Sequence, residues 1–171
     1  VDADARYDDL ARLSTLADRP MSGQADASVL GYYTLLNQSF DIDAQVVGND
    51  IAVDVPQADR LLEGRSTIDL KARRDEVGIE IEDFAVNAKR LTATAQGLVS
   101  SLSSDLTSQI SMPSLADADP SYGGSLQAEA KLNGPQGQRR LTVSGLAEDL
   151  RIGIEALDNA LSGKTNLTAI A

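Results

Sequence analysis

The sequence contains neither cysteine nor histidine in its 171 residues. Without cysteine no disulfide can form, and cysteine usage therefore gives no information about the redox compartment. The two absences also exclude thiol nucleophiles, serine–histidine–aspartate triads and metal sites built from thiolates or imidazoles. Because no complete catalytic motif remains, an enzyme is the least favoured class of function, and we expect no cofactor.

Aromatic residues are scarce at 4%, and tryptophan is absent, although 42% of the residues are hydrophobic. A compact core usually depends on more large rings. Thin layers of strands filled by aliphatic side chains therefore suit this composition better. Basic residues are also outnumbered, 15 against 26 acidic ones, which gives a net charge of −11. This charge argues against nucleic acid as a partner and against docking through a basic patch on anionic lipid.

Long apolar runs are missing as well. No stretch approaches the roughly 20 residues that a membrane-spanning helix needs, and no signal peptide opens the chain. The sequence starts with Val1-Asp-Ala-Asp-Ala and ends within an alternating pattern at Ala171. We therefore expect a single segment of a longer repeat array, with any membrane anchor outside it.

What is present is alternation of apolar and polar residues, which predicts half-buried β-strands. The pattern is clearest at residues 51–55, 67–72, 77–81 and 125–132, and it recurs at 40–46, 91–95, 141–143 and 150–154. One face of these strands should form an apolar groove. The candidate groove residues are Ile42, Ala44, Ile51, Val53, Val55, Ile68, Leu70, Ile79, Ile81, Leu91, Ala93, Leu126, Ala128, Ala130, Leu132, Leu141, Val143, Ile152, Ile154 and Leu167.

Turn signals separate these runs at residues 48–50, 73–76 and 133–137. Helical periodicity is weak. Leu10, Leu13 and Leu16 share one helical face, which predicts a short helix that covers the sheet, and residues 113–117 suggest a single further turn. Residues 98–112 carry leucine or isoleucine every fourth position, but their many serines favour a strand in the second half. The fold class is therefore all-β with one or two short helices.

Two stretches about 100 residues apart align without a gap, which is typical of a repeat. Residues 51–64 match 150–163, and an alternating strand follows each stretch. The repeat units are approximately 1–97 and 98–171, the second being incomplete. The matched turn positions are Asp59, Leu62 and Gly64 in the first copy and Asp158, Leu161 and Gly163 in the second.

This Asp-x-x-Leu-x-Gly turn followed by an alternating strand resembles the repeats of the TamB family of translocation and assembly module proteins. Residues 75–97 resemble them too, with an alternating strand after Val77-Gly78 and a second strand that ends in Ala95-Gln-Gly97. The broader AsmA-like group of bridge-type lipid-transfer proteins has similar patterns. The resemblance covers nearly the whole chain, and it depends on the order in which the motifs recur.

Membership of this family implies a repetitive antiparallel sheet curled into a β-taco, or an open trough like a β-solenoid. It implies a periplasmic location in a Gram-negative bacterium, with the parent protein anchored in the inner membrane. It also implies phospholipid transport or outer-membrane protein assembly. The expected partners are phospholipid acyl chains or unfolded outer-membrane protein strands, together with an Omp85-type outer-membrane protein.

Carboxylates cluster at residues 2–9, 41–43 and 75–83. Oxygen ligands of this kind suit calcium, but the spacing of an EF-hand loop and the glycine-rich calcium repeat are both missing. These clusters are best interpreted as solvated faces of strands, and we expect no metal site.

Two functions compete. An open groove favours a periplasmic conduit for lipid or for unfolded outer-membrane protein. A groove closed by its own side chains favours a structural or adhesive β-solenoid of a surface protein. Because alternation alone fits both, the content of the groove is the feature that separates them.

Overall fold

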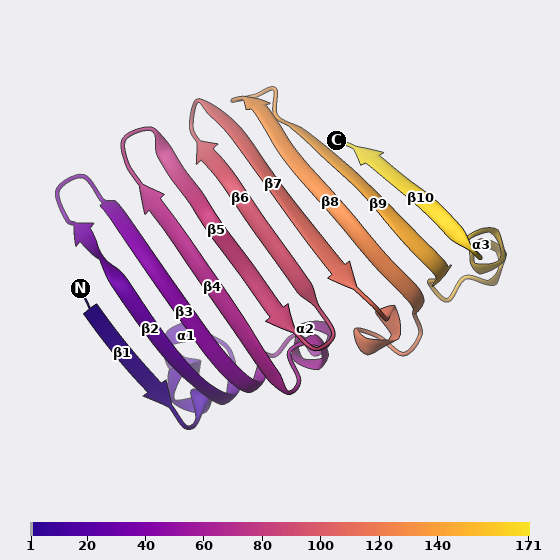
Figure 1. The fold of residues 1–171 in the computed structure, drawn as a ribbon, viewed down its shortest axis with the longest axis horizontal. Coiled ribbons are helices and arrows are strands. Elements are labelled where there is room, and N and C mark those ends of the chain that lie inside the picture. The colour runs from indigo at the N-terminus through magenta and orange to yellow at the C-terminus, as the bar shows by residue number, and fades with distance from the viewer. Residues whose placement is uncertain (1) are drawn as a thin grey trace.

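The computed structural model describes residues 2–171, with the side chains of Leu16 and Ala156 excepted, and these residues form a ten-stranded antiparallel sheet. Each strand pairs with the strand before it and the strand after it along the chain (Figure 1). The strands are β1 Asp2–Tyr7, β2 Ser22–Thr34, β3 Ser39–Ala52, β4 Arg65–Arg74, β5 Gly78–Ala88, β6 Thr92–Ser100, β7 Ser103–Met112, β8 Gly123–Pro135, β9 Arg140–Arg151 and β10 Lys164–Ile170.

The helices all lie along one margin of the sheet, where odd-numbered strands end (Figure 1). The 3₁₀ helix η1 (Leu10–Leu13) and α1 (Ser14–Ala17) join β1 to β2, and α2 (Pro56–Leu61) joins β3 to β4. Further along, η2 (Leu115–Asp117) joins β7 to β8, and α3 (Glu155–Ala160) joins β9 to β10. Short turns at 35–38, 75–77, 101–102 and 136–139 make the opposite margin.

Register places most of the apolar side chains of the strands on one face of the sheet. Cross-strand pairing links one row across nine strands: Ala27, Val46, Ile68, Val86, Ala93, Ile110, Ala128, Gly145 and Leu167. Successive residues of a strand point to opposite faces, so the residues two positions away share this face. We call it the apolar face, and the opposite one the polar face.

Most of the buried apolar side chains gather where the helices meet the apolar face. Leu10 of η1 packs with Ala25 of β2 and Ile51 of β3 in one cluster. Leu115 of η2 packs with Ala147 and Leu150 of β9 in a second cluster. The turns η1 and η2 therefore each bury a leucine on the sheet, and the hydrophobic effect of that burial holds them in place.

The all-β prediction, with a repetitive antiparallel sheet and short helices, is confirmed. Residues 98–112 form the end of β6 and all of β7, so their four-residue spacing does not mark a helix. Leu106 lies on the apolar face, whereas Leu98 lies on the polar face and Leu102 in the turn.

Several local predictions need correction. The strands predicted at 51–55 and 150–154 end early, at Ala52 and Arg151. The segment Gly48-Asn-Asp50 is not a turn between strands, because β3 continues through it to Ala52. Asp50 takes a positive φ of 52° there, which bends the strand without ending it. The short helix expected at residues 8–18 is also divided, into the 3₁₀ turn η1 and the single turn α1. Leu10 covers the sheet as expected, whereas the side chain of Leu16 lies outside the described residues.

Candidate functional site: the apolar face of the sheet

Most of the predicted groove residues lie together on the apolar face. Twelve of them are half-buried members of its cross-strand rows: Ile42, Ala44, Ile68, Leu70, Ile81, Ala93, Leu126, Ala128, Ala130, Leu132, Val143 and Leu167. Ile79 and Leu141 lie on the same face near the opposite margin, with exposed fractions of 38% and 39%.

The remaining six lie at the helix margin or outside the sheet. Ile51, Val53 and Ile152 pack in the two buried clusters beneath the helical turns. Leu91 lies in the turn before β6. The predictions for the last two positions need correction: Val55 and Ile154 are the residues that precede the first turns of α2 and α3, and both are exposed. Positive φ angles at Asp54 and Gly153 end the extended backbone just before them.

Several apolar-face residues were missed because a β-bulge hides them. The pairing of β5 with its neighbours shifts between Ile81 and Phe84. The shift reverses the alternation, so that Phe84 and Val86 join the same face as Ile79 and Ile81. The sequence signal is present in hindsight, since two acids, Glu82 and Asp83, separate two apolar alternating runs.

The middle of the apolar face has no second layer over it among residues 2–171, because every strand belongs to the one sheet. The helical turns pack along one margin. Two buried hydroxyls, those of Ser66 and Ser104, also belong to this face and have no hydrogen-bond partner among the described residues. The surface is therefore mainly aliphatic, with isolated hydroxyls close to its two margins.

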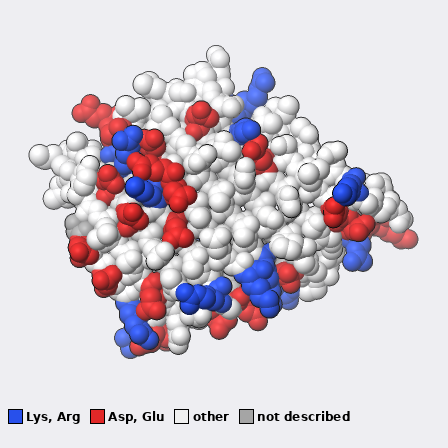
Figure 2. All heavy atoms as spheres, viewed as in Figure 1, with Lys and Arg blue, Asp and Glu red and all other residues white. Residues whose placement is uncertain are grey.

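The polar face is divided into a half with many charges and a half with few. In Figure 1 the turns α1 and α2 lie behind the sheet, so Figure 2, drawn from the same side, shows the polar face. Charged atoms gather over β2 to β5, and a field without charge covers much of β6 to β9 (Figure 2). In the half with many charges Arg73 donates to Glu80 at 2.7 Å and lies 3.8 Å from Glu82. These ion pairs cross neighbouring strands and are exposed, so each stabilises the sheet only slightly.

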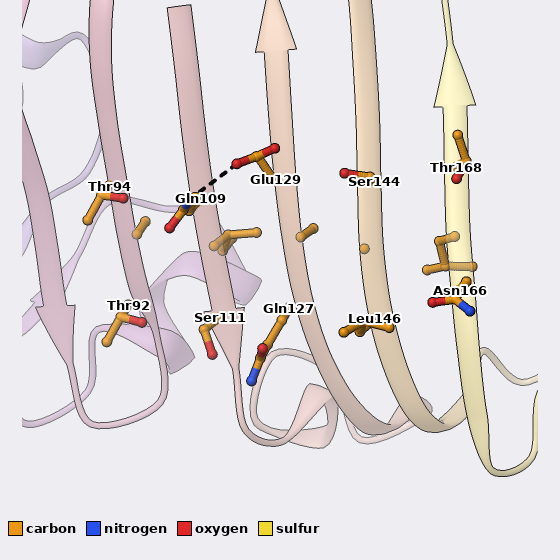
Figure 3. Close-up of a pocket in the computed structure, with 15 residues that line it drawn as sticks. Thr92, Thr94, Gln109, Ser111, Gln127, Glu129, Ser144, Leu146, Asn166 and Thr168 are labelled. Carbon is orange, nitrogen blue, oxygen red and sulfur yellow. Dashed lines mark hydrogen bonds between the residues drawn. The ribbon is translucent and has the colours of Figure 1, made fainter.

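The half with few charges is hollowed. A cavity of about 740 Å³ is lined by three consecutive residues on each of β6 to β10, and the outer two of each triplet point to the polar face (Figure 3). These outer residues are Thr92, Thr94, Gln109, Ser111, Gln127, Glu129, Ser144, Leu146, Asn166 and Thr168. The sequence alone does not mark this hollow, because nine of these ten residues are simply the polar members of alternating pairs and the tenth, Leu146, is an isolated exposed leucine.

Glu129 is the one carboxylate among the residues that line this hollow. Lys131 and the Gln109 side chain amide donate hydrogen bonds to it, and both lower the pKa of Glu129 from its ordinary value. The Gln109 bond, at 3.3 Å, joins β7 to β8 (Figure 3). The carboxylate is therefore ionised at neutral pH and balanced by Lys131, and the hollow carries little net charge.

The repeat-turn residues form two matching hydrogen-bonded turns. The carboxylate of Asp59 accepts the N–H of Val53 at 2.7 Å, and that of Asp158 accepts the N–H of Ile152 at 2.7 Å. The side chains of Leu62 and Leu161 pack in the two buried clusters. Gly64 and Gly163 follow with φ angles of 84° and 81°, which glycine adopts without steric cost.

No group of three or more acidic, histidine or cysteine residues suited to a metal ion occurs within residues 2–171. The helices of this part of the chain are also too short and too polar to cross a membrane. Comparison of the chain with protein-family models, with curated proteins and with solved structures finds no match.

Proposed function

We propose that the apolar face is a trough for the acyl chains of phospholipid, in a periplasmic segment that resembles the TamB family. The observation that carries the proposal is the continuous aliphatic surface across the whole sheet, with no second layer over its middle among residues 2–171. The helical turns close one margin of this surface. The resemblance of the repeats to TamB-like sequences adds the expectation of an inner-membrane anchor in the parent protein.

Energetics support an acyl chain as the occupant. Each methylene that leaves water gains about 0.8 kcal/mol, so a tail of about a dozen methylenes gains on the order of 10 kcal/mol. The rows of the apolar face repeat from strand to strand with similar aliphatic side chains, for example Ala93, Ile110 and Ala128. A tail could slide along such rows without breaking a fixed polar contact. This property suits transport better than storage.

An unfolded outer-membrane protein strand is the second cargo that this face fits. Such strands alternate apolar and polar residues, and their apolar side chains would cover the same rows. Assembly of outer-membrane proteins with an Omp85-type partner is therefore the second form of the proposal. A structural solenoid, closed by its own side chains, would instead leave the face unable to bind either cargo.

The experiment pairs substitutions on neighbouring residues that point to opposite faces. Ala93→Asp with Ala128→Asp places charge on the apolar face, whereas Thr94→Asp with Gln127→Asp places the same charge on the polar face. We expect the protein purified from a Gram-negative host to carry phospholipid in native mass spectrometry. The first pair of substitutions should abolish this lipid and the second should retain it.

Circular dichroism should show strand content in both double variants, so that loss of lipid reports on the trough. In case the aspartates unfold the sheet, Ala93→Trp with Ala128→Trp fills the same space without charge and should also reduce lipid uptake. A lipid-free protein that takes up no fluorescent phospholipid would contradict the lipid proposal. If it instead bound a peptide with the sequence of an outer-membrane strand, the second cargo would take its place.

A further inference from the structure

The hairpin that joins β2 to β3 carries the most exposed large apolar side chains of the described residues. Leu35 and Leu36 form its tip with exposed fractions of 84% and 98%, and Tyr32 and Tyr33 lie just behind them at 58% and 55%. The tip projects at the margin away from the helices (Figure 1). Side chains this exposed contribute little to packing within the sheet, so their apolar surface is available to a partner.

Charge is absent from the tip of this hairpin. The nine residues from Tyr32 to Phe40 include no acidic or basic residue, whereas 24% of the whole chain is charged. Figure 2 shows the tip as an uncharged lobe at the left edge of the molecule. The turns at 75–77 and 136–139 differ, since acids or arginines lie in or beside each of them, and the turn at 101–102, which is also uncharged, exposes only one leucine, Leu102. The β2–β3 tip therefore combines exposed aliphatic surface with electrical neutrality.

The order of side chains along the hairpin matches the layers of a membrane surface. Leucines occupy the tip, and the two tyrosines follow at the next level on opposite faces: Tyr33 pairs with Phe40 on the apolar face, and Tyr32 pairs with Asp41 on the polar face. Tyrosine prefers the interface, where its ring is in apolar surroundings and its hydroxyl is wet. Leucine prefers the hydrocarbon beneath.

The turn itself is well defined. Gln38 adopts a φ of 55°, and the carboxamide oxygen of Asn37 accepts the N–H of Ser39 at 3.1 Å. Insertion would therefore need no refolding of the hairpin, and the loss of conformational entropy on binding would be small.

We propose that the β2–β3 hairpin tip inserts into the surface of an electrically neutral lipid bilayer, with Leu35 and Leu36 in the outer hydrocarbon and Tyr32 and Tyr33 at the head groups. A neutral bilayer fits because the tip offers no cation to anionic lipid and the chain as a whole has a net charge of −11. This site differs from the trough, since it binds the membrane surface and not a single acyl chain.

The test uses the absence of cysteine, which permits a single label. Leu36→Cys, carrying a nitrobenzoxadiazole dye, is mixed with phosphatidylcholine vesicles, and Leu157→Cys in α3 at the opposite margin is the matched control. The emission of the dye should shift to the blue at position 36 and stay unchanged at position 157. Adding phosphatidylglycerol to the vesicles should weaken binding, because the chain is acidic.

Vesicle flotation then measures the contribution of the tip. Leu35→Asp with Leu36→Asp should reduce the partition coefficient at least about tenfold, because two leucines lose their transfer to hydrocarbon. Leu157→Asp, which changes a leucine that is 45% exposed, should leave it unchanged. The trough variant Ala93→Asp with Ala128→Asp should still float, so this inference and the proposed function fail separately.

Two results would overturn the inference. One is vesicle binding that survives the double substitution at the tip, or that gives no blue shift at position 36. The other is a dimer in sedimentation that the double substitution converts to a monomer, without binding of vesicles by the native chain. In that case the partner of the tip would be a second copy of the protein.

Discussion

Asp50 and Gly64 are joined by two hydrogen bonds that close the turn around α2. The backbone N–H of Gly64 donates to the carboxylate of Asp50 at 2.8 Å, and the backbone N–H of Asp50 donates to the carbonyl oxygen of Gly64 at 2.9 Å. Asp149 and Gly163 make the same two bonds around α3, both at 2.9 Å. The two copies of the sequence motif therefore fold into one structural unit, which returns the chain to the sheet for the next strand.

The conformation of Gly64 makes this unit sensitive to substitution. Its φ is +84°, but a Cβ added there would meet no atom within 4 Å. Gly64→Ala should therefore destabilise the protein through the backbone alone, by about 1–2 kcal/mol. Gly64→Asn should cost less, because asparagine tolerates a left-handed conformation. Urea unfolding measures both, and equal stabilities of the alanine variant and the native protein would contradict this geometry.

Arg90, in the turn between β5 and β6, links α2 to η2. Its guanidinium donates to the carbonyl oxygen of Arg60 at 2.7 Å, forms an ion pair with Glu63, and lies 3.5 Å from the carboxylate of Asp117. The hydrogen bond to Glu63 raises the pKa of Arg90 above its ordinary value, so the guanidinium is charged at neutral pH. Arg90 therefore connects two helical turns that are more than 50 residues apart in the sequence.

Removal of this link should loosen the helix margin. Arg90→Ala should lower the urea midpoint of unfolding, and Arg90→Lys should recover only part of the loss, since a single ammonium cannot match a planar guanidinium with several partners. In 1 M salt the difference between the native protein and Arg90→Ala should narrow, because screening weakens the ion pairs. Full recovery by Arg90→Lys would mean that charge alone, without geometry, makes the contribution.

The sequence predicts the strands well because alternation is a local property. In β8, Leu126, Ala128, Ala130 and Leu132 alternate with polar residues, and register places all four on one face. The turns around α2 and α3 could also be anticipated, since their aspartate, leucine and glycine recur at fixed spacing. Strands β1 and β2 were not predicted, and in β1 the signal is weak because Asp2, Asp4 and Arg6 alternate mainly with alanine.

Other features depend on contacts between distant residues, and local patterns do not contain them. The bulge in β5 moves Phe84 to the apolar face, and only the pairing with Leu70 of β4 and Ala95 of β6 reveals it. The polar hollow arises in the same way, because its lining comes from five strands that register brings side by side. The exposure of Leu36 is likewise a property of the folded hairpin, although the absence of charge around it can be read from the sequence.

Acid should weaken the turn between β4 and β5. The carboxylate of Asp75 accepts the N–H groups of Val77 at 2.8 Å and Gly78 at 3.2 Å, and these bonds, that of Val77 first, lower its pKa from 3.8. Because the folded pKa lies below the unfolded one, the stabilisation is complete above about pH 3.8 and is lost as the pH falls through the folded pKa.

The measurement compares the native protein with Asp75→Asn in thermal unfolding between pH 7 and pH 2. The native protein should be the more stable at pH 7, and the difference should shrink as the pH falls below about 3.8. Glu76→Gln removes the same charge in the same turn without changing either hydrogen bond, so it serves as the control. A difference between the native protein and Asp75→Asn that stays constant with pH would show that Asp75 keeps no such bonds in solution.

The covered and the open parts of the apolar face should respond differently to loss of side-chain volume. Leu115 is 8% exposed beneath its helical turn, whereas Leu70 of β4 lies half-buried in the middle of the face with no layer above it. Leu115→Ala should destabilise by about 2–4 kcal/mol, because it leaves a cavity. Leu70→Ala should cost less, about 1 kcal/mol, since water or lipid can fill the space.

Added phospholipid should stabilise the native protein against urea, and it should stabilise the Leu70→Ala variant less, because the variant offers an acyl chain less surface. Equal losses for the two substitutions, in dilute lipid-free protein, would mean that the middle of the face is already packed against another layer and is closed to an acyl chain.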